Sequence, residues 1–196
     1  IASLTVGDLE VRDKRRDDLL SARHIHFRAA RLFPSELTNE KPAFDLSADI
    51  RDLFLPKGFS LPIGRKIESF RVKLQFMGPF NRPVNRENLE AWRDEGGIIE
   101  ISSLESRYGP LQMVASGTLA LDHELQPLAA MSVNLQGYIP ALDQLSSVGV
   151  IGPGEAAIAK LVLGTLSRRE VDGGQASVRL PLNIRDRVLR AGGIKL

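Results

Sequence analysis

Apolar and polar residues alternate with a period of two in seven or eight segments of this 196-residue chain. The clearest segment is residues 69–76, in which the even positions from Phe70 to Phe76 are apolar and the odd positions are polar. Successive side chains of a β-strand point to opposite faces, so this pattern predicts a strand with one buried and one solvated face. It is typical of antiparallel sheets, because parallel strands are usually buried on both faces.

Three segments depart from this period and predict helices. The first, residues 85–95, begins with Asn85, a residue type that caps helices, and is followed by a Gly-Gly pair that ends it. Prolines in the first turn open the other two helices, at residues 138–148 and at residues 153–166. In the last helix, spacings of three and four residues predict that one side faces the core, formed by Ile158, Leu161, Val162 and Leu166.

These elements predict an α+β fold with one large, curved antiparallel sheet of about eight or nine strands, wrapped around or covered by about three short helices. We expect a single domain over residues 1–196. Strands followed by a helix and a further strand occur in both halves of the chain, so the domain could contain two similar parts, residues 1–97 and 98–196.

The predicted helices are too small to cover the predicted sheet. Eight strands spaced ~4.8 Å apart and about 27 Å long give an apolar face on the order of 1,000 Å². Three helices ~10 Å wide, rising ~1.5 Å per residue, cover about 500 Å² of it. The remaining half needs another cover, since a monomer rarely exposes such a patch: closure of the sheet on itself, a partner protein or a hydrophobic ligand.

A ligand-binding groove is one of these alternatives, and the sequence leaves open whether the sheet closes into a barrel or keeps such a groove. The candidate lining residues are apolar residues of the alternating segments, and each is equally suitable as a core residue.

 The eight candidates for the groove are thus Phe44, Leu46, Phe70, Val72, Leu74, Phe76, Met113 and Met131.

Composition narrows the function classes. The chain has 26 Lys and Arg against 24 Asp and Glu, a net charge of +2, and no aromatic-rich basic motif, so we expect no nucleic-acid partner. It has no cysteine, which excludes disulfides, cysteine-ligated zinc and thiol catalysis. No apolar run approaches the ~18–20 residues that span a bilayer as a helix.

Candidate catalytic chemistry is sparse. No Gly-x-Ser-x-Gly motif is present. His24 and His26 share one face of a predicted strand and could bind a metal with His123, but arginines flank them and no acid–histidine motif accompanies them. We therefore predict no metal, no cofactor, no catalytic residue and no enzymatic activity. Trp92, the one tryptophan, is expected to plug the core beside Leu89.

A basic cluster near the carboxyl end could contact acidic phospholipid headgroups. Solvated strand faces commonly carry such charges too, so the cluster is also consistent with an ordinary surface. Its candidate residues are Arg179, Arg185, Arg187 and Arg190.

Short motifs, mostly in the second half of the chain, resemble bacterial domain-of-unknown-function family 2125. Their order and spacing carry the resemblance; they are AWRDEGG at 91–97, IIEI at 98–101, YGPL at 108–111, GTLALD at 117–122, QP at 126–127, GY at 137–138 and LPL at 180–182. Two residues depart from the family pattern: Tyr108 replaces a usual tryptophan, and Arg187 replaces a usual glycine after Asp186. The second departure puts a tight Asp-Gly hairpin turn in doubt.

The resemblance implies an alphaproteobacterial-type envelope protein, generally with a hydrophobic amino-terminal segment and without an assigned activity. We therefore expect a non-enzymatic periplasmic protein held at the inner membrane by a segment upstream of Ile1, with a curved sheet that shelters a lipid-like ligand. The alternative is a structural or assembly protein that uses its sheet to dock a partner subunit. The identity of the ligand or protein partner and the oligomeric state stay open.

Overall fold

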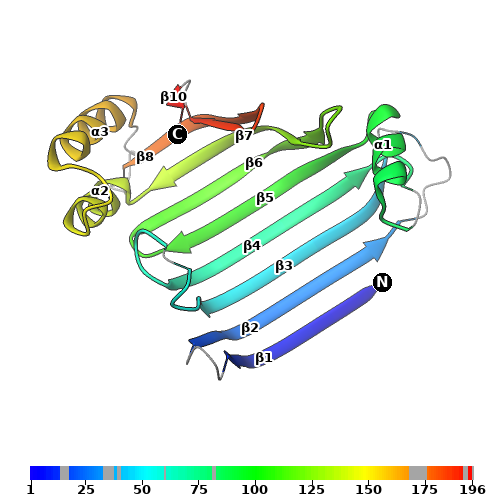
Figure 1. Cartoon of the computed structure of the whole chain (residues 1–196), viewed down its shortest axis with the longest axis horizontal. Helices are drawn as coiled ribbons and strands as arrows, with labels where there is room; N and C mark the ends of the chain where they lie inside the picture. Colours follow the sequence, from blue (N-terminus) through cyan, green and yellow to red (C-terminus); the bar gives the residue numbers. More distant parts are fainter. Residues whose placement is uncertain are drawn as a thin grey trace.

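Among the residues that the structure describes, ten strands form one antiparallel sheet in the computed structural model of the chain (Figure 1). The described residues are 1–13, 18–32, 38, 41–59, 61–80, 83–167, 176–191 and 194–195. The strands are β1 (Ala2–Asp13), β2 (Asp18–Arg31), β3 (Pro42–Phe54), β4 (Lys66–Met77), β5 (Ile98–Tyr108), β6 (Leu111–Leu121), β7 (Pro127–Gln136), β8 (Ser177–Arg185), β9 (Val188–Ala191) and β10 (Ile194–Lys195). The helices are α1 (Arg86–Asp94), α2 (Tyr138–Ser147) and α3 (Pro153–Leu166).

Strands that follow one another in the chain are neighbours in the sheet, from β1 to β10. The register places apolar residues of adjacent strands opposite one another: Phe44 faces Phe76 and Leu46 faces Leu74. The same row continues into β5, where Ile99 lies opposite Phe76. Because side chains alternate between the two faces of a strand, this pairing gives the sheet one continuous apolar face and one polar face.

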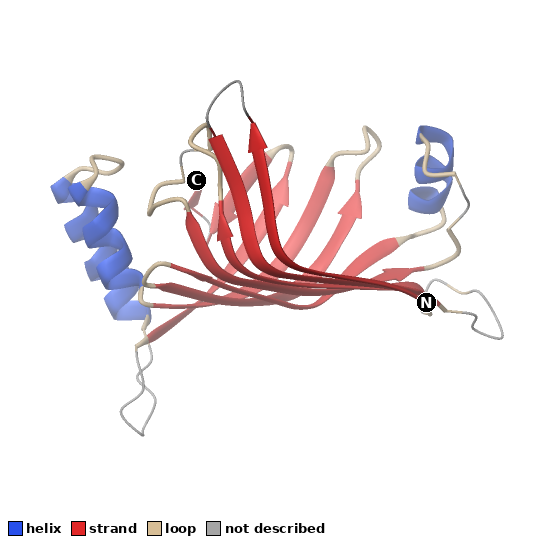
Figure 2. Ribbon diagram, turned by 90° about the horizontal axis from the view of Figure 1, so that it is seen from below, coloured by secondary structure: helices blue, strands red, loops and turns tan. Residues whose placement is uncertain are grey.

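The sheet is curved and forms a single layer, with the helices at the ends of strands (Figures 1 and 2). α1 lies in the connection from β4 to β5, and α2 and α3 lie in the connection from β7 to β8. The expected α+β fold with a curved antiparallel sheet is confirmed. The helices cover less of it than the sequence suggested, because they stand beside the apolar face and leave its middle without a second layer (Figure 2).

The prediction that α3 packs its apolar side into the core is wrong. Ile158 and Leu161 are 65% and 71% exposed, and Val162 and Leu166 are exposed as well. Within α3, Ala156 is the buried residue. Helical spacing identifies residues that share a side, but it does not supply a surface for that side to pack against.

Few side chains in the described part of the chain are fully buried. The buried apolar residues number thirteen, and seven of these are alanines. The total accessible surface is 12844 Å², whereas a compact monomer of this mass exposes roughly 9,000 Å². The excess is consistent with an open layer whose apolar face is not sealed by the protein itself.

Two aspartates in left-handed backbone conformation interrupt the strands. Asp8 in β1 and Asp52 in β3 both have φ of 49°, a conformation that aspartate tolerates better than most residues. The carboxylate of Asp52 lies 2.8 Å from Lys66 Nζ and 3.2 Å from a guanidinium nitrogen of Arg23. Its ion pairs therefore connect β2, β3 and β4 at this point, and the hydrogen bond from Lys66 is the main cause that lowers the pKa of Asp52.

Tyr108 fixes the connection between β3 and β4. Its hydroxyl donates a hydrogen bond to the carbonyl of Gly64 at 2.8 Å and accepts one from the backbone N–H of Ile63 at 2.6 Å. Burial raises the pKa of this hydroxyl, while the bond from Ile63 acts in the opposite direction. Tyr108, one of the two residues that depart from the pattern of the resembled family, thus has a defined structural role.

No helix in the described part of the chain has the length and apolar character needed to cross a membrane.

Candidate functional site

The candidate site lies where α1 meets the apolar face of the sheet. The side chain of Asn85 accepts a hydrogen bond from the N–H of Asn88 at 2.8 Å and caps the helix. Trp92, 3% exposed, donates from Nε1 to the carbonyl of Met77 at 2.8 Å. This bond ties α1 to the end of β4 and confirms Trp92 as a buried plug.

A cavity of about 620 Å³ lies between α1 and the adjoining strands. Phe80 lies between two other rings that line it, with centroids 6.4 Å from Phe44 and 6.0 Å from Trp92, both in edge-to-face geometry. The lining is apolar apart from one aspartate: Ala29, Phe44, Asp45, Leu46, Phe76, Phe80, Val84, Leu89, Trp92, Ile99, Leu121 and Leu125. Both its volume and its lining are in the usual range for small-molecule sites.

Only some of the predicted groove residues line the cavity beside α1. Phe44, Leu46 and Phe76 line this cavity together. The other candidates lie on the apolar face beyond the cavity: the register of β4 to β8 places Phe70, Val72, Leu74, Met113 and Met131 there. The predicted set is therefore one face of the sheet, of which a part forms a cavity.

Several lining residues were not predicted. Phe80, Val84 and Leu125 come from connections between elements, and the pattern of a strand gives no information about where a connection packs. Leu89 and Trp92 carried a usable signal, because they are three residues apart on α1 and therefore share a side. That signal predicted packing on the sheet, but not a space left between helix and sheet.

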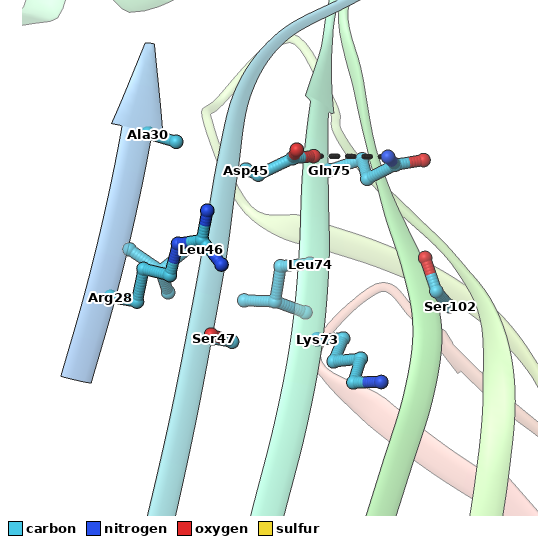
Figure 3. Close-up of a pocket in the computed structure, with 9 residues that line it drawn as sticks. All are labelled: Arg28, Ala30, Asp45, Leu46, Ser47, Lys73, Leu74, Gln75 and Ser102. Carbon is cyan, nitrogen blue, oxygen red and sulfur yellow. Dashed lines mark hydrogen bonds between the residues drawn. The ribbon is translucent and has the colours of Figure 1, made fainter. Parts of the chain in front are cut away.

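A second hollow, of about 290 Å³, lies on the polar side of the sheet (Figure 3). Arg28 of β2 and Lys73 of β4 both lie opposite Ser47 of β3 in the register. Ser102 of β5 also lines it and belongs to a β-bulge, since the register of β5 shifts between Ile101 and Leu104. The lining of this hollow is mixed. Arg28 and Lys73 lie on either side of Ser47, while Ala30, Leu46 and Leu74 add apolar atoms.

The chemistry of this hollow does not resemble a hydrolytic centre. The carboxylate of Asp45 accepts a hydrogen bond from Gln75 Nε2 at 2.9 Å (Figure 3). Among the described residues, neither Ser47 nor Ser102 forms a hydrogen bond to a group that could act as its base. A nucleophile–base pair is therefore not assembled here.

The three histidines do not come together. His26 Nδ1 lies 2.7 Å from the hydroxyl of Thr5, on the polar side of β2, and His24 lies opposite Arg51. His123 lies instead in the turn between β6 and β7. No group of three histidine, aspartate or glutamate residues in the described ranges is placed to bind a metal ion.

Charged side chains on the polar face form pairs with one another. Arg51 donates to both carboxylate oxygens of Asp49, at 3.3 and 3.2 Å, and this hydrogen bonding is the main cause that lowers the pKa of Asp49. On the next strands, Arg71 lies 3.4 Å from Glu105. Such exposed pairs are typical of a solvated sheet face.

The four arginines of the predicted basic cluster lie around the last strands. The register places Arg179, Arg185 and Arg190 on the polar face, because each alternates with apolar residues that face the other side. Arg187 lies in the turn between β8 and β9, 3.6 Å from Glu124. The cluster and the apolar cavity therefore belong to opposite faces of the sheet.

Comparisons with known proteins bear on the family alone. No curated protein and no solved structure matches the chain. The family described as "Uncharacterized protein conserved in bacteria (DUF2125)" matches residues 2–196. Because the match spans nearly the whole chain, the protein belongs to this family of conserved bacterial proteins.

Proposed function

We propose that this protein is a non-enzymatic carrier of a lipid-like ligand, whose acyl chain lies on the apolar face of the curved sheet. The observation that carries the proposal is the cavity of about 620 Å³ beside α1, which opens onto an apolar face without a second layer. A solvent-exposed apolar surface of this extent favours an occupant over water.

The expected affinity follows from the chemistry of an acyl chain. Each methylene group that leaves water contributes about 0.8 kcal/mol, so burial of about ten of them contributes roughly 8 kcal/mol. That free energy corresponds to a dissociation constant of about 1 μM. The loss of motional freedom on binding weakens this value. We therefore expect a fatty acid to bind with a dissociation constant of about 1 μM or weaker.

Trp92 offers a direct test, because it is the one tryptophan of the sequence and lines the cavity. Titration with a dansyl-labelled fatty acid is expected to quench Trp92 emission and excite the dansyl group by energy transfer. Val84, which lines the cavity and is 72% exposed, can be changed with little cost to the fold. Val84→Asp is expected to weaken binding at least tenfold, because it places a charge in the apolar lining.

Val114→Asp is the matched control. Val114 is 53% exposed and lies opposite Glu105 on the polar face of the sheet. This variant is expected to bind the fatty acid as the parent chain does. Absence of energy transfer in the parent chain, or equal binding by Val84→Asp, would rule out the carrier function.

A second candidate function is assembly with a partner subunit. β1 is the outermost strand of the sheet, and its side chains Leu4 and Val11 are exposed. Outer strands offer unpaired backbone groups to which another strand can add. Under this alternative, analytical ultracentrifugation would detect a stable complex, in the purified chain or with a partner from cells. A strict monomer that captures no partner would contradict it.

We further propose a periplasmic location at the inner membrane. The support is the envelope association implied by the family resemblance, together with the lipid supply that such a location would give a carrier. A fusion of the full-length protein to alkaline phosphatase, which is active outside the cytoplasm, is expected to be active. An inactive but intact fusion would contradict this location.

A further inference from the structure

The helical hairpin formed by α2 and α3 exposes most of its large apolar side chains. Between 42% and 71% of each of these side chains is exposed, and together we call them the hairpin patch: Ile139, Val148, Val150, Ile158, Leu161 and Val162. Six such residues, on two adjacent helices and in the loop between them, expose an area of the same order as the largest apolar patch of a typical monomer, roughly 300–600 Å². Patches of this size usually mark an interaction surface.

The loop that joins the two helices is apolar as well. Residues 144–154 carry no charged side chain, and Val148 and Val150 in this stretch are exposed. Surface loops between helices are normally rich in polar residues, because they lie in water. The composition of this loop therefore indicates an apolar environment.

The charges of the hairpin are satisfied within it. Lys160 of α3 donates to the carboxylate of Asp143 of α2. The carboxylate of Glu155 accepts from the backbone N–H of Gly152 at 2.9 Å and caps α3. No other charged residue occurs between Tyr138 and Leu166. The patch thus offers apolar contact without a pattern of free charges that a specific protein partner could recognise.

The position of the hairpin favours a lipid surface as the occupant. α2 and α3 project beyond the ends of the strands, and the loop between them lies on the same side of the sheet as α1 (Figures 1 and 2). A projecting apolar surface needs a complementary surface on a protein partner, whereas a fluid bilayer adapts to it. α3 has 14 residues and is about 21 Å long, too short to span the ~30 Å bilayer core but suited to lie in the interface.

We propose that the hairpin patch docks the protein onto the surface of a lipid bilayer. The contact is driven by apolar burial and needs no acidic lipid, because the patch itself carries no free charge. It is independent of the proposed carrier function, since the patch lies outside the cavity beside α1.

Vesicle flotation tests this directly with the full chain. The protein is expected to float with vesicles of neutral phosphatidylcholine, and raising the salt concentration about fivefold is expected to change the bound fraction less than twofold. Ile158→Glu and Leu161→Glu are each expected to lower the bound fraction at least fivefold. Both residues are more than 60% exposed, so the fold should survive, which circular dichroism checks. Val114→Glu, an equally polar change on the far side of the sheet, is expected to bind like the parent chain.

Three results would overturn the proposal. The first is a parent chain that does not float with either neutral or acidic vesicles. The second is flotation with acidic vesicles alone that is lost with salt, which would assign the contact to the arginine cluster. The third is a concentration-dependent dimer that Leu161→Glu dissolves, without vesicle binding, which would assign the patch to a second copy of the chain. Unchanged fatty-acid binding by Leu161→Glu separates this proposal from the carrier function.

Discussion

Gly97 has no room for a side chain, because the indole ring of Trp92 lies against it. A methyl group built on Gly97 would lie 2.2 Å from Trp92 Cε2. Gly97→Ala must therefore displace the buried ring and its hydrogen bond to Met77, and we expect it to lower the free energy of unfolding by about 1–3 kcal/mol. Urea denaturation followed by Trp92 fluorescence measures this loss.

Gly7→Ala serves as the control for this substitution. Nothing lies within 4 Å of a methyl group built on Gly7, so its free energy of unfolding is expected to stay within about 0.5 kcal/mol of the parent value. Equal effects of the two substitutions would show that the contact between Gly97 and Trp92 is not what holds α1 in place.

The lowered pKa of Asp52 predicts that the free energy of unfolding depends on pH. The hydrogen bond from Lys66 lowers the pKa of this carboxyl in the folded state. A carboxyl whose pKa is lower in the folded than in the unfolded state stabilises the fold above the unfolded pKa of about 4, and this contribution is lost as pH falls further. Asparagine tolerates the same left-handed backbone, so Asp52→Asn removes the charge and leaves the conformation accessible.

We therefore expect Asp52→Asn to lower the urea midpoint at pH 7. The difference from the parent chain should shrink as pH falls below about 4, because the parent carboxyl then becomes protonated as well. A difference that stays constant between pH 7 and pH 3 would contradict the role given to the pair with Lys66.

At the scale of elements, the hairpin from β8 to β9 turns without glycine. Asp186 and Arg187 have φ of 52° and 59°, the left-handed values that a tight two-residue hairpin turn requires and that glycine adopts most easily. The doubt about a tight turn is thus resolved: the turn forms, with arginine in a strained conformation. The exposed pair of Arg187 with Glu124 contributes little to stability.

Arg187→Gly is expected to relieve this strain. A left-handed residue other than glycine costs roughly 1–2 kcal/mol, and the greater freedom of glycine in the unfolded chain offsets part of the gain. We expect a net stabilisation of about 0.5–1 kcal/mol, or about 2 °C in Tm, by calorimetry. Arg185→Gly, at the last residue of β8, should lower Tm instead. A rise in both would refute the strain argument.

The elements themselves could be predicted from the sequence, whereas their packing could not. Alternation in residues 69–76 identified β4 and its faces, and Asn85, Pro140 and Pro153 marked the starts of helices. The error concerned α3: its apolar residues suggested a cover for the sheet, but this helix is apolar on nearly all sides and gives no direction for docking. The cavity was foreseen only through Phe44, Leu46 and Phe76, since its remaining walls come from α1 and connections.

At the scale of the whole molecule, the sheet has more apolar face than the chain can cover. The sequence predicts that the helices leave about half of that face uncovered. In the structure, the middle of the sheet has no second layer (Figure 2). Closure into a barrel, one of the three remedies considered, is excluded by the open strand order from β1 to β10 among the described residues. The two remaining ways to cover the face are a bound ligand and a partner protein. They correspond to the two candidate functions proposed above.

Native mass spectrometry of the protein purified from bacterial cells without detergent tests the carrier claim most directly. The account predicts a population heavier than the bare chain by the mass of a lipid, which collisional activation releases and which Val84→Asp reduces. A single species at the mass of the bare chain, both as purified and after incubation with excess fatty acid, would contradict it.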